Sequence, residues 1–369
     1  MHKIMPHRHP FCCVVPPYIL ERVSERAGRH PAEAAARTLT QDASLRVTRT
    51  VQSVAAQTAP KTADQKPGAR VSARRAARPA VRINRTIYTT RNTQNLPGDV
   101  ARTEASAASG DVAVDEAYDG LGSTFDFFSQ IFERNSIDNN GLPLKASVHY
   151  GTDYGNAFWN GQQMVFGDGD GVIFNRFTGS LDIIGHELTH GVTMSEVHLL
   201  PIFQPGALGE SVSDVFGSLI KQWTLNQDAQ SADWLIGAEL FTENVNGVAL
   251  RSMKDPGNAY DDPVLGKDPQ PRHMRDYVHT INDFGGVHIN CSIPNLAFYL
   301  LATSLGGFAW ERAGRIWYET VTDDRMWHHM TFARFAQLTL SNAVRLYGNG
   351  SEETEAVQDA WEQVGIVVD

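Results

Sequence analysis

The sequence predicts an α+β protein built from two lobes. Between about residues 86 and 180, short strand-like runs alternate with turn residues. After Ser180 the apolar residues recur mainly at helical spacing through to Asp369. A predicted helix near residues 181–195 lies between these two patterns. We therefore expect a β-rich lobe followed by a helical lobe, joined by a central helix, with a functional site where the lobes meet.

The composition is that of an ordinary globular protein with room for an additional segment. The chain has 369 residues, of which 42% are hydrophobic and 20% are charged. No run of apolar residues approaches the length of a membrane span, so we expect no membrane association. Three cysteines are too few for a disulfide framework.

Charge separates the N-terminal region from the rest. Residues 1–85 contain 16 Lys and Arg against 5 Asp and Glu, which is a net charge of +11, so the remaining residues carry −21 of the total of −10. A basic segment can bind nucleic acid, but no recognised nucleic-acid motif accompanies this one. We expect no nucleic-acid partner and favour a basic extension that docks on the acidic body.

The extension itself divides into two parts. Residues 1–50 include a predicted helix from about Pro31 to Leu39, whereas residues 51–85 are rich in Ala, Gln, Thr, Pro, Lys and Arg and bury little. The second part is therefore expected to be a flexible linker open to proteolysis. The first ten residues carry charge but no apolar core behind them, so a classical signal peptide is not expected. On that basis we expect a cytoplasmic protein or one exported by a non-classical route.

One short motif carries metal chemistry. In His186-Glu187-Leu188-Thr189-His190, the two histidines are four residues apart and share one face of a helix. Both imidazoles can therefore reach one tetrahedral zinc ion, and Glu187 can act on a water molecule beside it. Taken alone, the five-residue pattern leaves a chance match open.

A third ligand must come from another segment. Glu210 could complete the set, and Asp214, one helical turn later, could hold the second nitrogen of a histidine. From these residues alone, two solvated acids on an exposed helix face remain the favoured alternative.

Taken together, the motifs resemble the thermolysin family of zinc metallopeptidases. In that family the glutamate ligand follows the first histidine by 24 residues, as Glu210 follows His186 here. Two further blocks match in the same order, residues 156–161 with the sequence NAFWNG and residues 283–290 with DFGGVHIN. The similarity extends from about Thr86 to Asp369.

The resemblance implies a thermolysin-like two-lobe fold and a zinc-dependent endopeptidase. One zinc ion would be held by His186, His190 and Glu210, with Asp214 behind a histidine. Glu187 would serve as the general base that activates water. A zinc-binding pseudopeptidase that acts as a binding protein is the alternative.

The resemblance also implies roles in substrate binding. His288, positioned by Asp283, would donate to the oxyanion, and Arg251 would bind a substrate carbonyl. Asn156, Ala157 and Trp159 belong to the block that resembles the strand along which the peptide is held. The pocket for the residue after the cleaved bond would be lined by Phe174, Ile183, Ile236 and Leu250. This pocket implies cleavage before bulky apolar residues, although plain core packing also explains its side chains.

The segment Pro16-Pro17-Tyr18-Ile19-Leu20 resembles the short prosegment of the protealysin branch. It implies a zymogen whose own residues near 11–20 lie across the cleft. A thiolate of Cys12 or Cys13 on zinc is conceivable, but we favour inert thiols. The expected divisions are a prosegment at 1–50, a linker at 51–85, a β-rich catalytic lobe with the central helix at 86–195, and a helical lobe at 196–369.

Two positions depart from the family pattern. Pro201 stands where the family has a tyrosine that helps to bind the oxyanion, and proline cannot donate a hydrogen bond. We therefore expect a working but weakened enzyme. Asp182 and Asp233 match ligands of the paired calcium site, but Lys221 introduces a cation there, so we expect no calcium. Peptides or proteins are the expected substrates, and a monomer is the expected state.

Overall fold

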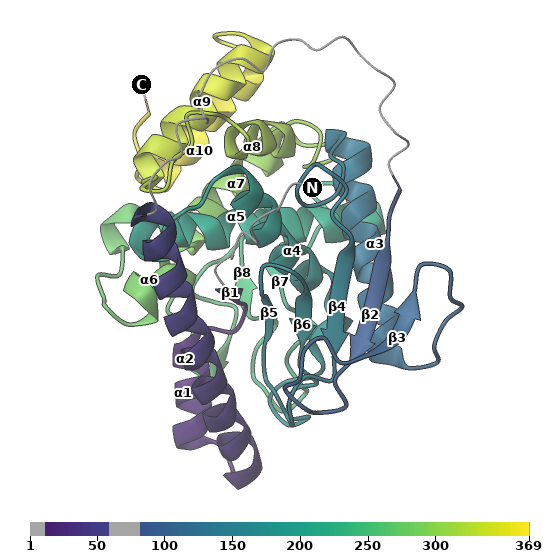
Figure 1. The fold of residues 1–369 in the computed structure, drawn as a ribbon. Coiled ribbons are helices and arrows are strands. Elements are labelled where there is room, and N and C mark those ends of the chain that lie inside the picture. Colours follow the sequence, from purple (N-terminus) through teal and green to yellow (C-terminus); the bar gives the residue numbers. More distant parts are fainter. Residues whose placement is uncertain (1–11, 59–81, 369) are drawn as a thin grey trace.

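The structure, a computed structural model, describes residues 12–58 and 82–368, with the backbone alone at residue 12 and residues 45–58. Figure 1 shows a sheet on one side, two long helices through the middle and further helices at one end. This arrangement confirms the predicted α+β fold with two lobes. Within the described ranges, no helix has both the length and the apolar character that crossing a membrane requires.

The first lobe is built on a six-stranded mixed sheet. The strands lie in the order β1-β5-β6-β4-β2-β3. The pairs β2–β4 and β4–β6 are parallel, and the other pairs are antiparallel. The strand bounds are Cys12–Cys13 for β1, Arg85–Thr89 for β2, Asp99–Thr103 for β3, Leu144–Val148 for β4, Ala157–Trp159 for β5 and Met164–Phe166 for β6. The strand β1 thus brings the N-terminal extension to the edge of this sheet.

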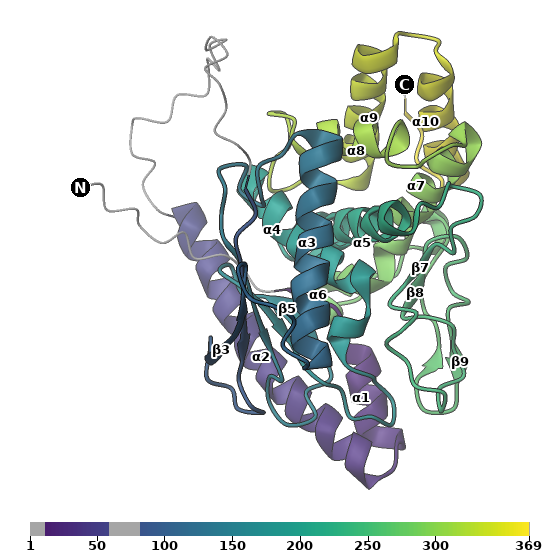
Figure 2. The same cartoon turned by 90° about the vertical axis from the view of Figure 1, so that its right-hand side faces the viewer.

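Helix α3, Val112–Phe132, runs alongside the sheet (Figure 2). Its first turn is capped by Asp111, whose side chain accepts hydrogen bonds from the backbone N–H groups of Ala113 and Val114. Its apolar residues include Phe127, Phe128 and Phe132, which pack on one another with ring centroids 5.5–6.1 Å apart. The helix therefore anchors the sheet to the middle of the molecule.

The middle of the molecule consists of α4, Leu181–Glu196, and α5, Phe203–Leu225. Two glycines let these helices approach closely. A Cβ atom at Gly217 would lie 2.4 Å from the carbonyl oxygen of Asp182, and one at Gly185 would lie 2.8 Å from the Ile220 side chain. Because no side chain separates the backbones there, polar residues of α5 can reach those of α4.

The second lobe is helical at its end but not throughout. Its helices are α6 at Asp283–Asn290, α7 at Ser292–Leu305, α8 at Ala313–Val321, α9 at Phe332–Tyr347 and α10 at Glu352–Gln363. Before them come four two-residue strands, β7 at Leu235–Ile236, β8 at Arg251–Ser252, β9 at Asp261–Asp262 and β10 at Gly266–Lys267. The mainly helical pattern expected from Ser180 to Asp369 therefore holds for α4, α5 and α6–α10, but not for residues 226–271. Frequent Gly, Asn, Asp and Pro between residues 226 and 271 favour turns over helix.

The N-terminal extension forms a helical hairpin. Helix α1 is Pro17–Arg26 and α2 is Arg29–Thr58. The predicted helix from Pro31 to Leu39 was therefore too short, and residues 51–58 of the expected linker are helical. The sequence explains the difference, because no glycine or proline occurs between Pro31 and Pro60 to end the helix.

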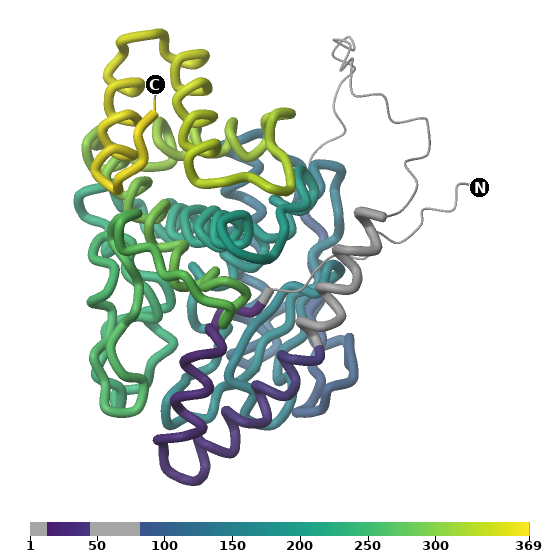
Figure 3. Tube along the Cα trace, turned by 90° about the vertical axis from the view of Figure 1, so that its left-hand side faces the viewer, coloured from purple at the N-terminus to yellow at the C-terminus, as the bar shows by residue number. Residues whose placement is uncertain are grey.

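This hairpin contacts both lobes (Figure 3). The Arg22 guanidinium of α1 donates to the carbonyl of Leu265 in the second lobe, and Arg37 of α2 pairs with Asp153 near the sheet. The apolar side chains of Ile19 and Leu20 are fully buried. The extension is thus packed as part of the core, as the predicted docking on the acidic body requires.

Candidate active site

Three side chains from α4 and α5 converge on one point. The Nε2 atoms of His186 and His190 lie 3.1 Å apart. The Oε2 atom of Glu210 lies 3.5 Å from Nε2 of His186 and 3.6 Å from Nε2 of His190. All three residues are buried, and one ligand atom from each lies within 4.8 Å of the others. The structure therefore brings together the three residues that the sequence motifs single out.

This donor set fits zinc. Two imidazole nitrogens and one carboxylate oxygen are ligands that zinc prefers, and three protein ligands leave one position open, as in catalytic sites. Although burial raises the pKa of the Glu210 carboxyl, the imidazoles of His288 and His190 hold it well below its usual value. Glu210 is therefore a carboxylate, which is the form that binds a cation.

Asp214 contacts the side of the His186 ring that faces away from the other two residues. One of its oxygens lies 2.8 Å from Nδ1 of His186, so the Nε2 atom of that ring is turned toward the cluster. Arg251 donates to both carboxylate oxygens at 2.7 and 2.8 Å, and Asn295 donates to one at 2.9 Å. Burial raises the pKa of Asp214, but the Arg251 guanidinium and His186 lower it to a net value below the usual range. Asp214 thus holds both the His186 ring and the Arg251 guanidinium in place.

Glu187 lies next to the cluster on α4. Its Oε2 atom accepts a hydrogen bond from the backbone N–H of Trp159 at 3.0 Å. Trp159 belongs to β5, the strand of the sheet that pairs with β1. The backbone of the edge strand therefore orients the carboxylate of Glu187.

His288 faces the same point from the second lobe. Its Nδ1 atom lies 2.7 Å from Asp283, which also accepts from the backbone N–H of His288 at 2.8 Å. Its Nε2 atom lies 3.4 Å from Oε2 of Glu210. Asp283 can turn back on the histidine because the chain between them adopts positive φ at Phe284, Gly285 and Gly286. The ring of His288 is thereby aimed at Glu210.

Residues of the extension add a strand to the sheet beside these side chains. Strand β1 pairs antiparallel with β5, with Cys13 opposite Phe158. The carbonyl oxygen of Cys13 lies 3.1 Å from Nε2 of His288. The backbone of the extension therefore lies directly against His288.

The next two residues of the extension hold the groups expected to bind substrate. The N–H of Val14 donates to the carbonyl of Ala157 at 3.2 Å, and Arg251 donates to the carbonyl of Val14 at 3.2 Å. The Asn156 side chain accepts from the N–H of Val15 at 2.9 Å and donates to its carbonyl at 3.3 Å. Both peptide groups are therefore satisfied by the catalytic domain.

Asp42 of α2 forms a second anchor, which the sequence reasoning missed. Its two carboxylate oxygens accept from the Tyr154 hydroxyl at 2.5 Å and from the Asn156 amide at 2.8 Å. Nearby, Thr38 accepts from the backbone N–H of Gly155 at 3.1 Å. Asp42 is fully buried, although a single acid on a polar helix gives no sequence signal of burial.

The Cys13 thiol lies away from the metal ligands. Its side chain is buried in a cluster with Tyr150, Tyr154, Phe158 and Val165. Among the described side chains, the group able to hold a metal contains His186, His190 and Glu210 and no cysteine. The Cys13 thiol is therefore not a member of this group, and the side chain of Cys12 lies outside the described residues.

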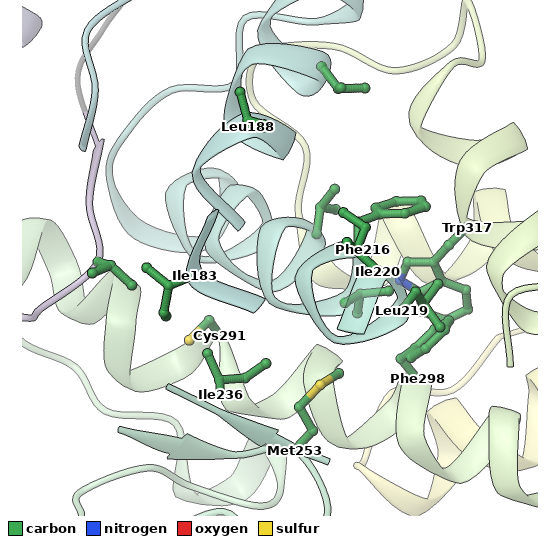
Figure 4. Close-up of a cluster of buried hydrophobic side chains, with 14 of the residues drawn as sticks. Ile183, Leu188, Phe216, Leu219, Ile220, Ile236, Met253, Cys291, Phe298 and Trp317 are labelled. Carbon is green, nitrogen blue, oxygen red and sulfur yellow. The ribbon is translucent and has the colours of Figure 1, made fainter. Parts of the chain in front are cut away.

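The four apolar residues expected to line a specificity pocket are all buried. They are Phe174, Ile183, Ile236 and Leu250, with exposed fractions of 0–1%. Figure 4 shows Ile183 of α4 and Ile236 of β7 pointing toward one another beside Cys291. Leu250 joins them through its backbone N–H, which donates to the carbonyl of Ile236 at 3.0 Å.

The two departures from the family pattern occupy different places. Pro201 lies partly buried in the loop between α4 and α5. Lys221 is buried, with its Nζ atom 3.3 Å from Asp182 and 3.0 Å from Asp233. Although burial lowers the pKa of Lys221, Asp182 and its other acidic neighbours raise it to a net value above the usual range. Lys221 is therefore a cation between the two acids.

Comparison with known proteins agrees with this geometry. A model of the thermolysin metallopeptidase catalytic domain matches residues 49–194, and a model of the family's alpha-helical domain matches residues 202–366. An extracellular metalloprotease of Pectobacterium carotovorum subsp. carotovorum is 49% identical over 359 residues, which cover 97% of each chain. Protease PrtS of Photorhabdus sp. strain Az29 is 51% identical over 78% of this chain and 77% of that protein. The solved precursor of protealysin from Serratia proteamaculans has a TM-score of 0.84 and 50% identity, and the match covers 96% of this chain and 100% of that one.

One expectation is corrected by these relatives. We expected a cytoplasmic protein or non-classical export because no signal peptide is evident in the sequence. The Pectobacterium relative, which matches nearly the whole chain, is named an extracellular metalloprotease. The absence of a recognisable signal was therefore a poor guide to location.

Proposed function

The chain belongs to the thermolysin family of zinc metallopeptidases, and from this premise we propose that His186, His190 and Glu210 bind its zinc ion. The chain is a zinc-dependent endopeptidase made as a zymogen. Zinc, when bound, polarises the carbonyl of the peptide bond and makes water a stronger nucleophile. The convergence of three ligand atoms within 4.8 Å carries the assignment of the ligands. None of the comparisons supports the alternative of a pseudopeptidase.

The remaining catalytic roles follow from the surroundings of each side chain. Glu187 takes a proton from the attacking water and delivers it to the leaving nitrogen. The N–H of Trp159 keeps its carboxylate in place for both transfers. His288, oriented by Asp283, donates to the oxygen of the carbonyl as negative charge develops on it.

The substrate lies along β5 as an added strand. Asn156, the carbonyl of Ala157 and the guanidinium of Arg251 bind its backbone, as they bind residues 14 and 15 of the extension. Phe174, Ile183, Ile236 and Leu250 line the pocket for the residue after the cleaved bond. The enzyme therefore prefers bulky apolar residues at that position.

His288 is expected to carry much of the oxyanion binding because Pro201 has no N–H to share it. Replacing His288 with alanine should lower kcat about 10²- to 10³-fold on a peptide substrate. A matched alanine substitution at the exposed His279 should change kcat little. A loss of less than tenfold at His288 would mean that another donor binds the oxyanion.

We propose that Lys221 takes the place of calcium. The position between Asp182 and Asp233 is filled by the Lys221 ammonium, which repels a second cation. Adding calcium should therefore leave the unfolding temperature unchanged. Replacing Lys221 with methionine should lower the free energy of unfolding by about 3 kcal/mol, because it strands the buried Asp182. Stabilisation of the unmodified protein by calcium, measured by calorimetry, would contradict the proposal.

We place the enzyme outside the cell, where the name of its Pectobacterium relative places that protein. We propose a prosegment at residues 1–50, a linker at 51–85 whose first residues, 51–58, are helical, and lobes at 86–195 and 196–369. Peptides and the chain's own prosegment are the partners, and we propose a monomer that binds neither nucleic acid nor membranes.

The function is tested by measuring peptide hydrolysis by purified mature enzyme with its zinc, after the zinc is removed and after it is added back. Hydrolysis of an apolar peptide should require one zinc ion per chain, should stop with 1,10-phenanthroline and should return when zinc is added. Full activity in a protein shown to be free of zinc would contradict the assignment.

A further inference from the structure

The contacts of the extension define a register as well as a position. Two consecutive carbonyl groups are bound by different catalytic-domain residues, Cys13 by His288 and Val14 by Arg251. Since the proposed role of His288 is to bind the carbonyl under attack, the bond to be cleaved corresponds to the one between Cys13 and Val14, and Arg251 then binds the next carbonyl. This step rests on the proposed roles of His288 and Arg251.

The backbone contacts farther along agree with this register. The N–H of Val14 meets the carbonyl of Ala157, and both polar groups of the Val15 peptide meet the Asn156 side chain. A shift by one residue would reverse the faces to which the side chains point and would break these pairs. The register is therefore fixed by several independent hydrogen bonds.

The side chains on the two sides of this bond occupy different surroundings. Cys13 packs among Tyr150, Tyr154, Phe158 and Val165, next to the edge strand. Val14 is fully buried within the large core cluster, which also contains Ile183, Ile236 and Leu250. A small residue before the bond and an aliphatic residue after it are thus both accommodated, as a cleavable substrate requires.

We propose that the zymogen hydrolyses its own Cys13–Val14 bond in cis. One water molecule adds to the carbonyl carbon of Cys13, and the bond from that carbon to the Val14 nitrogen breaks. Glu187 passes a proton from the water to the departing nitrogen. The products are a carboxylate on Cys13 and an amine on Val14.

This cut trims the prosegment without releasing it. Residues C-terminal to the cut keep the hydrogen bonds of Val15 to Asn156, of Asp42 to Tyr154 and of Arg22 to Leu265. Ile19 and Leu20 also remain buried. The segment from Val14 onward therefore stays in the cleft, and full activation needs a separate cleavage after α2.

The test is a time course on the full-length, zinc-loaded chain, followed by intact-mass and N-terminal analysis. We expect a peptide ending at Cys13 and a chain beginning at Val14, whose masses sum to that of the intact chain plus one water. The rate should not change with protein concentration, because the reaction is intramolecular. The Glu187→Gln chain should remain uncut at this bond.

Two variants distinguish a loss of cleavage caused by the residue at position 14 from a loss caused by unfolding of the prosegment. Val14→Leu keeps an aliphatic residue after the bond and should still be cut, whereas Val14→Asp should lose this cut. The unfolding temperature of each variant reports whether the prosegment still folds, and a cut at 13–14 in a folded Val14→Asp chain would overturn the proposal.

A control with an apolar peptide distinguishes this inference from the proposed function. If mature enzyme hydrolyses the peptide while the bond between residues 13 and 14 stays intact in the full chain, or is cut only at a rate that rises with concentration, the inference fails and the function stands. If zinc-loaded mature enzyme does not hydrolyse the peptide, both fail together.

Discussion

Replacing Glu187 with glutamine is expected to lower kcat of the mature enzyme by about 10²- to 10⁴-fold while zinc remains bound. The amide has nearly the shape of the carboxylate, so the contact with the N–H of Trp159 can be kept. It cannot accept a proton from water at neutral pH, and the transfer to the leaving nitrogen is lost with it. His186, His190 and Glu210 are unchanged, so the metal site should persist.

The measurement pairs peptide hydrolysis with zinc content by mass spectrometry. Glu311→Gln, an exposed position in the second lobe, is a matched control that should retain activity. A Glu187→Gln enzyme with more than a tenth of the normal kcat would show that another group acts as the base. A protein that has lost its zinc would show instead that Glu187 supports the metal site.

Asp214→Ala should damage both stability and metal binding. The carboxylate accepts four hydrogen bonds, from His186, twice from Arg251 and from Asn295. Its removal leaves the buried Arg251 guanidinium without its counter-ion, which we expect to cost about 3–5 kcal/mol of unfolding free energy. The His186 ring also loses the partner that orients it, so zinc affinity should fall about 10- to 100-fold.

Asp214→Asn tests how much of the loss in stability and in zinc affinity comes from the negative charge alone. The amide keeps the volume and one acceptor oxygen but removes the negative charge, so packing is preserved while Arg251 is left unpaired. Chemical denaturation measures stability, and competition with a fluorescent chelator measures zinc affinity. If Asp214→Ala were as stable as the parent and bound zinc as tightly, Asp214 would contribute neither to stability nor to zinc binding.

The zinc site could be predicted from sequence because its parts have fixed spacing. His186 and His190 must share a helix face, and Glu210 follows at the family distance. Asn295 and Asp42 could not be found this way. Asn295 reaches Asp214 only after α7 has packed, and Asp42 reaches Asn156 only after α2 has packed. Nothing in the local sequence marks either residue as buried.

The same distinction applies to the fold. Helix α4 lies where the sequence predicts a helix, and β2, β4 and β6 lie in the segment where the sequence shows strand-like runs. Strand β1 has only two residues and exists because β5 offers an edge to it. The strands β7–β10 are equally short, so pairing with a partner, and not propensity, decides where they form.

In the proposed site, one metal ion joins α4 to α5. X-ray diffraction from the full-length zymogen, collected at the zinc absorption edge, tests it most directly. We expect one anomalous peak per chain, about 2.0–2.2 Å from Nε2 of His186, Nε2 of His190 and a carboxylate oxygen of Glu210. A zinc-loaded crystal with no peak there, or with the metal on other residues, would contradict it.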